Sequence, residues 1–177
     1  MAQVKQKQTI LIVDDDMQNR MILADMIGPT YEIVEAENGL EGVAAMQKLG
    51  TKISLVLLDI NMPEMDGFDV LAVMNKNKWI NDMPVIMVTS ETASSYLERA
   101  YDLGAVDFIN RPFDMKVVQR RVNNTILLFA KQKALVGMVA DQILEREKAN
   151  NLMISILSHI VEFRNGESGL HVMHVST

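Results

Sequence analysis

Five short apolar runs occur along the chain up to Phe113, and stretches with apolar residues at helical spacing separate them. The runs Thr9–Val13 and Ile53–Leu58 lack the apolar–polar alternation of a strand that has one face in water. Continuous runs of this kind are typical of strands buried on both faces of a sheet. Strands that alternate with helices form βαβ units. The sequence therefore predicts an α/β fold, a doubly wound five-stranded parallel sheet with helices on both faces.

The boundaries of these elements follow from turn residues and apolar spacing. The predicted strands are Thr9–Val13, Tyr31–Val34, Ile53–Asp59, Pro84–Val88 and Val106–Ile109. The predicted helices are Met17–Ile27, Gly39–Leu49, Phe68–Asn75 and Thr92–Leu103. Gly28, Gly50 and Gly104 follow three of these helices, at the position where glycine commonly ends a helix.

The sequence changes character after Asp114, where neither Gly nor Pro occurs before Gly137 or between Gly137 and Gly166. One set of residues recurs every seven positions, namely Val122, Phe129, Val136, Ile143, Asn150 and Leu157. This repeat predicts one long helix with a seam, in which an Asn can fix the register of a coiled coil. We favour a helix that leaves the domain and pairs with a second copy. The alternative is a final helix packed on the domain, followed by a loosely helical linker.

Composition restricts the partners of the chain. Its 177 residues carry a net charge of −6, whereas nucleic-acid binding usually needs clustered basic residues. The chain has no Cys, which excludes disulfides and thiolate metal sites. The apolar runs are shorter than a membrane span, and Met1–Thr9 lacks the apolar centre of a signal peptide. We expect a cytoplasmic protein that binds neither nucleic acid nor membranes.

Polar side chains follow three of the predicted strands. Asp14 and Asp15 follow the first strand, Asp59 ends the third, and Thr89 follows the fourth. Carboxyl ends of parallel strands meet at one edge of the sheet, so these groups can share a pocket. Three carboxylates repel one another unless a cation lies between them, and oxygen ligands suit Mg²⁺. One carboxylate could then attack a phosphoryl group, whose oxygens Thr89 and Arg111 could hold.

Each of these residues also has an ordinary structural interpretation. The run Asp14–Asp16 could cap the first helix, and Thr89 could cap a later one. Asp59 could stabilise the turn after its strand, and Arg111 could be a surface charge before Pro112. Their joint occurrence at neighbouring strand ends favours a shared site.

Residues 8 to about 128 resemble a response-regulator receiver domain. The resemblance is carried by the motif Leu58–Gly67, by the acidic pair, and by the strand-end hydroxyl and aromatic residues. It implies a flavodoxin-like sheet with strand order 2-1-3-4-5. It also implies that Asp59 accepts a phosphoryl group from a histidine kinase or phosphotransfer protein, with Mg²⁺ as cofactor. The implied site comprises Asp14, Asp15, Asp59 and the backbone carbonyl of Asn61 as metal ligands, with Thr89 and Phe108 as the switch.

The chain departs from the family at Arg111, where receivers almost always carry Lys before the Pro that follows the fifth strand. Arg keeps the charge but presents a planar fork in place of a compact ammonium. Our hypothesis is that Asp59 still accepts phosphate, while its coupling to Thr89 and Phe108 is altered. The alternative is a degenerate receiver that acts as a dimeric interaction module.

The last 25 or so residues resemble the opening of HD-GYP and related HD-type phosphohydrolase domains. Glu167 and His171 are four residues apart, so on a helix they would share a face. The resemblance implies that both lie at a metal centre. We expect a receiver over 8–128, a helical coiled-coil-like linker over 129–160 and a truncated output domain over 161–177. The intact protein is then expected to be a cyclic-di-GMP phosphodiesterase, with no hydrolase chemistry in the residues present.

Overall fold

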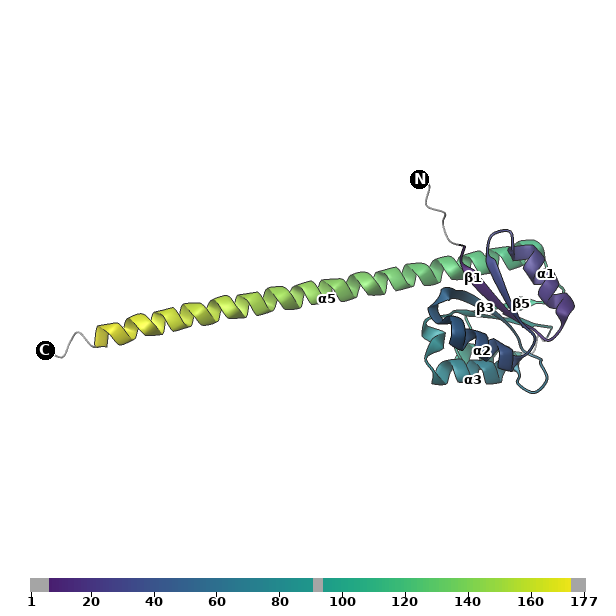
Figure 1. The fold of residues 1–177 in the computed structure, drawn as a ribbon, viewed down its shortest axis with the longest axis horizontal. Coiled ribbons are helices and arrows are strands. Elements are labelled where there is room, and N and C mark those ends of the chain that lie inside the picture. The colour runs from purple at the N-terminus through teal and green to yellow at the C-terminus, as the bar shows by residue number, and fades with distance from the viewer. Residues whose placement is uncertain (1–6, 91–93, 173–177) are drawn as a thin grey trace. The chain divides into compact units, whose positions relative to one another are not determined.

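The computed structural model of the chain describes residues 7–90 and 94–172, with side chains as far as Phe163. Five parallel strands form one sheet in the order β2-β1-β3-β4-β5, which confirms the predicted fold class (Figure 1). The strands are β1 (Thr9–Val13), β2 (Glu32–Ala36), β3 (Ile53–Asp59), β4 (Val85–Thr89) and β5 (Asp107–Asn110). The helices are α1 (Met17–Ile27), α2 (Gly39–Leu49), α3 (Gly67–Lys76), α4 (Ser94–Asp102) and α5 (Met115–Val172). Two short 3₁₀ turns, η1 (Gly50–Lys52) and η2 (Trp79–Asn81), precede β3 and β4.

The core has two layers because side chains alternate between the faces of each strand. On β3, Val56 and Leu58 pack with the inner faces of α2, α3 and α4, whereas Leu55 and Leu57 face the opposite layer. That second layer contains the inner residues of α1 and the first turns of α5. All four β3 side chains are fully buried, as expected for a central strand covered on both faces.

The register brings the carboxyl ends of the central strands to one edge. Val13 of β1 pairs with Leu58, and Asp59 at the end of β3 pairs with Val88. Thr89 at the end of β4 pairs with Asn110. The polar residues that end or follow these strands therefore lie at the same edge of the sheet, where open α/β folds bind ligands.

The second strand lies one to two residues further along the chain than the predicted range Tyr31–Val34. Tyr31 donates its backbone N–H to Ile27 and so completes the turn that ends α1. Pairing with β1 begins at Glu32 and continues to Ala36. Glu32 and Glu35 are exposed on this edge strand, so it lacks the continuous apolar run that marks a central strand.

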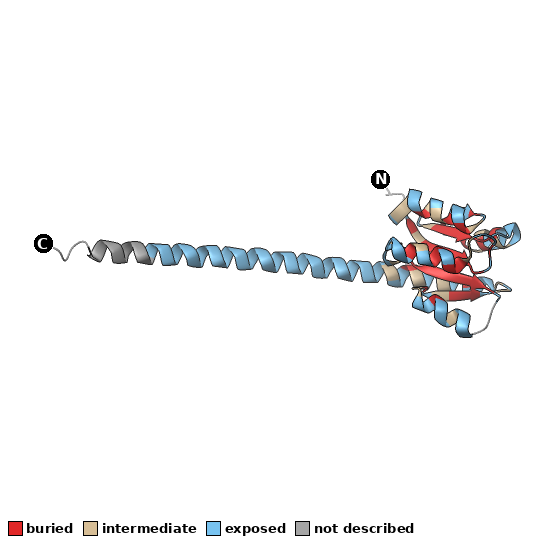
Figure 2. Cartoon of the chain, turned by 90° about the horizontal axis from the view of Figure 1, so that it is seen from below, coloured by how far each residue is buried: buried red, intermediate tan, exposed pale blue. Residues whose placement is uncertain are grey.

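Helix α5 contributes residues to both of the compact units into which the chain divides, Met1–Ala130 and Lys131–Thr177. Val118 and Val122 are fully buried against the sheet, and Ile126 nearly so. From Ala130 to Phe163 every residue of the helix is exposed (Figure 2). Val122 of the predicted seam therefore belongs to the core of the first unit, and Val136 is the first position of that seam that is exposed. Within the described part of the chain, no helix is long and apolar enough to cross a membrane.

Candidate functional site

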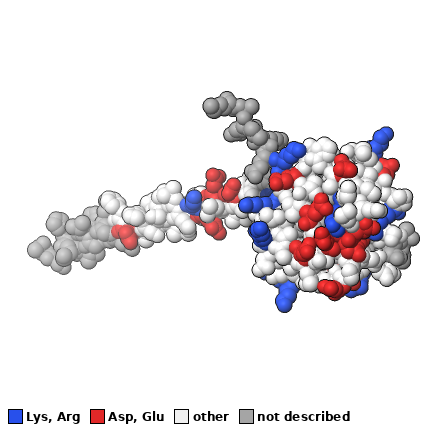
Figure 3. Space-filling model, turned by 45° about the vertical axis from the view of Figure 1, so that its right-hand side comes forward, with Lys and Arg blue, Asp and Glu red and all other residues white. Residues whose placement is uncertain are grey.

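Asp14, Asp15 and Asp59 come together at the carboxyl edge of the sheet. One carboxylate oxygen from each of the three lies within 4.8 Å of the others. Asp14 and Asp59 are only 1% and 2% exposed, whereas Asp15 is exposed. Acidic side chains gather on one face of the domain with few basic ones among them (Figure 3). The three-residue cluster thus has two buried members and one that faces solvent.

The three acidic residues in the loop after β1 have two different roles. Asp16 caps α1, because its carboxylate accepts a hydrogen bond from the Gln18 backbone N–H at 2.7 Å. The Asp14 carboxylate accepts hydrogen bonds from the Asp16 backbone N–H at 2.9 Å and from Asn19 Nδ2 at 3.3 Å. The capping interpretation therefore holds for Asp16, while Asp14 and Asp15 contribute carboxylates to the site.

The turn after β3 is built on a close approach of the backbone at Gly67. A Cβ at this position would lie 2.4 Å from the Asp59 carbonyl oxygen and 2.9 Å from Ile60 Cα. The Gly67 N–H donates to the Ile60 carbonyl oxygen at 2.9 Å. Asp66 and Asp69 form a capping box that starts α3 immediately after this turn. The loop that carries Asp59 is therefore fixed against the first turn of α3.

Arg111 lies between the two buried carboxylates. Its Nη2 donates a hydrogen bond to Asp14 Oδ2 at 2.9 Å and lies 2.8 Å from Asp59 Oδ1. The contact with Asp59 satisfies the distance of an ion pair but not the alignment of a hydrogen bond, so Asp59 Oδ1 is among the buried polar atoms left without a hydrogen-bond partner. The side chain of Arg111 is 24% exposed, so it is not an isolated surface charge.

The environment of Asp59 disfavours its charged form. Burial, together with the nearby Asp14 carboxylate, raises the pKa of Asp59 to about 6. Arg111 and a hydrogen bond from the Asn61 backbone act in the opposite direction on this pKa but do not cancel the increase. Asp59 is thus a buried carboxylate at a site with excess negative charge, which a cation would relieve.

Thr89 lies on β4, the strand next to that of Asp59, and Phe108 lies on β5, one strand further along the sheet. Thr89 is fully buried at the end of β4, and its carbonyl oxygen accepts the Arg111 backbone N–H at 2.9 Å. Phe108 on β5 is 7% exposed and packs edge-on against Tyr101 of α4, with ring centroids 5.0 Å apart. The backbone of Arg111 thus joins the ends of β4 and β5.

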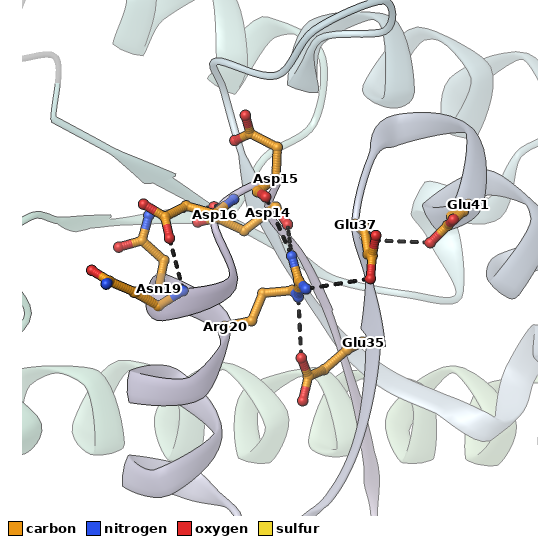
Figure 4. Close-up of polar contacts among 9 residues, drawn as sticks. Asp14, Asp15, Asp16, Asn19, Arg20, Glu35, Glu37 and Glu41 are labelled. Atoms are coloured by element: carbon orange, nitrogen blue, oxygen red, sulfur yellow. Dashed lines mark hydrogen bonds and ion pairs between the residues drawn. The ribbon is translucent and has the colours of Figure 1, made fainter.

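Arg20 is a polar residue of the site region that the sequence reasoning missed. It is 6% exposed on α1, and its guanidinium lies between the Asp14–Asp15 loop, Glu35 and Glu37 (Figure 4). A signal was present in the sequence, because Arg20 precedes Leu23 and Ile27 by three and seven residues on the inward face of the helix. A cation at an inward position requires buried acceptors.

Glu167 and His171 fall within α5, but their side chains lie outside the described residues. The predicted metal pair at that end of the chain remains a prediction.

The chemistry of the acidic cluster matches a hard divalent cation. Carboxylate oxygens without His or Cys are the ligands that Mg²⁺ prefers. Asp59 Oδ1 has no aligned hydrogen-bond donor, so it can interact with a cation or a phosphoryl group without losing an existing hydrogen bond.

A sequence model for the family described as "Response regulator receiver domain" matches residues 10–123. The matched range contains the acidic cluster, Thr89, Phe108 and Arg111. The chain belongs to the response regulator receiver family. It therefore carries the receiver domain of a two-component response regulator.

Curated relatives extend the likeness beyond the receiver domain. The chain is 28% identical over 172 residues to a "Probable cyclic di-GMP phosphodiesterase" of Vibrio cholerae, a match covering 93% of this chain and 38% of the relative. It is 31% identical over 171 residues to "Transcriptional regulatory protein ZraR" of Klebsiella oxytoca, covering 90% of this chain and 37% of the relative. The chain thus spans less than two fifths of either relative's length.

A solved structure shows the same receiver fold. The chemotaxis protein CheY4 of Vibrio cholerae matches with a TM-score of 0.62 and 26% sequence identity. The match covers 67% of this chain and 98% of that chain, so the likeness concerns the receiver part.

Proposed function

We propose that this receiver accepts a phosphoryl group on Asp59 from the phosphohistidine of a sensor histidine kinase or phosphotransfer protein. In this proposal Mg²⁺ is bound by Asp14, Asp15, Asp59 and the backbone carbonyl of Asn61. The observation that carries the proposal is the cluster of three carboxylate oxygens within 4.8 Å, whose Asp59 member has an oxygen without a hydrogen-bond donor. This oxygen can act as a nucleophile at the edge of the sheet when the Arg111 guanidinium, now 2.8 Å away, moves from it to the arriving phosphoryl group.

Different residues of the chain have different roles in the proposed phosphoryl transfer. Asp59 Oδ1 forms a bond to phosphorus while the phosphorus–nitrogen bond to the donor histidine breaks, and the departing imidazole keeps the electron pair. The Thr89 hydroxyl and the Arg111 guanidinium hold the oxygens of the arriving phosphoryl group. The carboxylates of the acidic cluster would hold Mg²⁺, whose positive charge would offset the negative charge on the transferring group. Phe108, now buried against Tyr101, is the side chain whose packing would report the change to α4 and α5.

The second candidate is a degenerate receiver that joins two chains without phosphoryl transfer. The observation that favours it is the position of Arg111, because its Nη2 contacts both Asp14 and Asp59. A guanidinium held there already supplies the positive charge that the buried carboxylates need. In this candidate Arg111 takes the place of the cation.

Labelling with radioactive acetyl phosphate separates the two candidates. Phosphoryl transfer predicts Mg²⁺-dependent labelling of the unchanged chain and none of Asp59→Asn. The degenerate receiver predicts equal, negligible labelling of both. If Arg111 alone blocks the site, Arg111→Lys gains labelling that the unchanged chain lacks, because an ammonium cannot reproduce the planar fork.

We propose that the exposed part of α5 pairs with a second copy and carries the signal to an output domain. Phe129, Val136, Ile143 and Leu157 lie seven residues apart or a multiple of seven, and the last three of these are more than half exposed. Helices in proteins are stabilised mainly by packing of an apolar face, so burial of these side chains against a second helix would stabilise α5. In this arrangement 8–128 is the receiver and 129–160 is the connecting helix.

The output that we propose is an HD-type phosphohydrolase that begins at about residue 161, with Glu167 and His171 as metal ligands and cyclic di-GMP as substrate. Support comes from the relative named as a probable cyclic di-GMP phosphodiesterase, which aligns with this chain beyond the receiver. ZraR aligns over a similar length, so the likeness beyond the receiver is not confined to relatives named as phosphodiesterases. Hydrolysis of cyclic di-GMP by a protein that extends beyond Thr177, and its loss in His171→Ala, is the test.

A further inference from the structure

Arg20 makes hydrogen bonds to the backbone of the loop that carries Asp14 and Asp15. Its Nη1 donates hydrogen bonds to the carbonyl oxygens of Asp14 at 2.9 Å and Asp15 at 3.4 Å. Both contacts are to the main chain of the two acids, so their carboxylates remain available to the site (Figure 4). The Asp14 N–H donates to the Ala36 carbonyl oxygen at 3.3 Å, which ties the same loop to the end of β2.

Two glutamates orient the guanidinium from the other side. Arg20 Nε contacts Glu35 Oε2 at 3.1 Å, and Nη2 lies 3.6 Å from Glu37 Oε1. The side chain of Arg20 is 7% exposed, whereas those of Glu35 and Glu37 are 43% and 71% exposed, so the guanidinium is buried and its glutamate partners face solvent. A guanidinium presents its five N–H groups in a fixed plane, and here they face acceptors in the loop between β1 and α1, on β2 and in the loop after β2. A single ammonium cannot reach all of these acceptors at once.

From this geometry we propose that Arg20 is a positioning residue that sets the divalent-cation affinity of the receiver by fixing the peptide backbone at Asp14 and Asp15. The inference rests on the proposed function, because it concerns the same acidic site. Arg20 touches neither the cation ligands' carboxylates nor the phosphoryl group. It acts through the two carbonyl oxygens that it binds.

The sign of the effect distinguishes positioning from electrostatics. If Arg20 acted only through its positive charge, its removal would strengthen cation binding, because a repulsive charge would disappear. Positioning predicts the opposite, since the two carboxylates would lose their fixed separation. Residues that orient metal ligands typically change metal affinity by about 10–100-fold when they are replaced.

Calorimetric titration of the folded chain with Mg²⁺, in the absence of any phosphoryl donor, tests this inference. Arg20→Met is expected to weaken the affinity by about tenfold or more. Arg20→Lys keeps the charge and is expected to weaken it by at least about threefold, because the fork is lost. The control is Lys48→Met, which removes a positive charge from an exposed position in the last turn of α2 and is expected to change the affinity by less than about twofold.

Each outcome bears on a different claim. Unchanged or tighter Mg²⁺ binding in Arg20→Lys would overturn the positioning role, while the proposed function would stand. The positioning role would also be overturned if Arg20→Met lowered only the free energy of unfolding and left the affinity of the folded protein unchanged. Should Arg20→Met not fold, the affinity of Arg20→Lys decides. No saturable Mg²⁺ binding by the unchanged chain would contradict the proposed function itself, and this inference with it.

Discussion

At the scale of single residues, the site is organised by the cost of burying Asp59. Its carboxylate is 2% exposed, lies close to Asp14, and has one oxygen without an aligned hydrogen bond. Such a group destabilises the folded state when it is ionised, unless a cation compensates it. The same feature that weakens the fold therefore prepares the residue to bind a cation and a phosphoryl group.

The free energy of unfolding of the cation-free protein should vary with pH because Asp59 titrates at a different pH in the folded and unfolded states. Its pKa is raised from 3.8 to about 6, so the folded state holds this proton more tightly than the unfolded state. Stability from this group is then greatest at low pH and falls as the pH rises through about 6. Between about pH 5 and about pH 7.5 the loss amounts to roughly 1 kcal/mol.

Asp59→Asn removes this titration and is expected to raise the free energy of unfolding near neutral pH. Urea denaturation in the presence of a chelator, at several pH values, measures the difference between variant and wild type. That difference should grow as the pH rises from about 5 to about 7.5. A constant difference across this range would show that Asp59 does not titrate there.

At the scale of elements, the β3–α3 turn depends on the missing side chain of Gly67. The atoms that a Cβ would meet are backbone atoms of Asp59 and Ile60, which cannot move aside as a flexible side chain could. Gly67→Ala is therefore expected to displace the loop that carries Asp59. The cost in stability should be about 1–3 kcal/mol, with slower phosphoryl transfer.

Gly137→Ala is the matched control for this substitution. Nothing lies within 4 Å of a Cβ at Gly137, which is in the exposed part of α5. Alanine there should stabilise the helix by about 0.5–1 kcal/mol. Thermal unfolding of both variants measures the contrast, and equal effects at the two positions would contradict the role given to the turn.

The sequence was sufficient to predict the part of the site that depends only on the order of strands and helices. Asp14, Asp15 and Asp59 converge because parallel strands end at one edge, and that follows from the order of elements. The place of Arg111 between two carboxylates depends on the path of a long side chain, which the pattern of residues does not determine. Arg20 was missed for a related reason, since its acceptors are backbone carbonyls and residues on β2 and the loop after it.

At the scale of the whole molecule, the exposed apolar residues of α5 are the observation behind the proposed dimer. Val118 and Val122 are buried against the sheet, so this part of the helix belongs to the core of the receiver. From Ala130 to Phe163 the described side chains are all exposed. An exposed apolar stripe of this length is typical of a helix that pairs with another.

Charge placed on the seam should separate the two chains of the proposed dimer. Ile143→Asp is expected to shift the sedimenting mass from dimer to monomer, because it puts two like charges in an apolar interface. Ala134→Asp places the same residue on the opposite face of the exposed helix and should leave the dimer intact. If both variants, or neither, dissociate, this seam is not the interface.

The central claim is that Asp59 forms an acyl phosphate, and chemical trapping of that bond tests it most directly. The chain is incubated with acetyl phosphate and Mg²⁺ and reduced with borohydride, which converts an aspartyl phosphate to homoserine. Peptide mass spectrometry then locates the change. We expect homoserine at Asp59 alone, dependent on Mg²⁺. Homoserine at another aspartate, or at none while the protein is folded and binds Mg²⁺, would contradict the account.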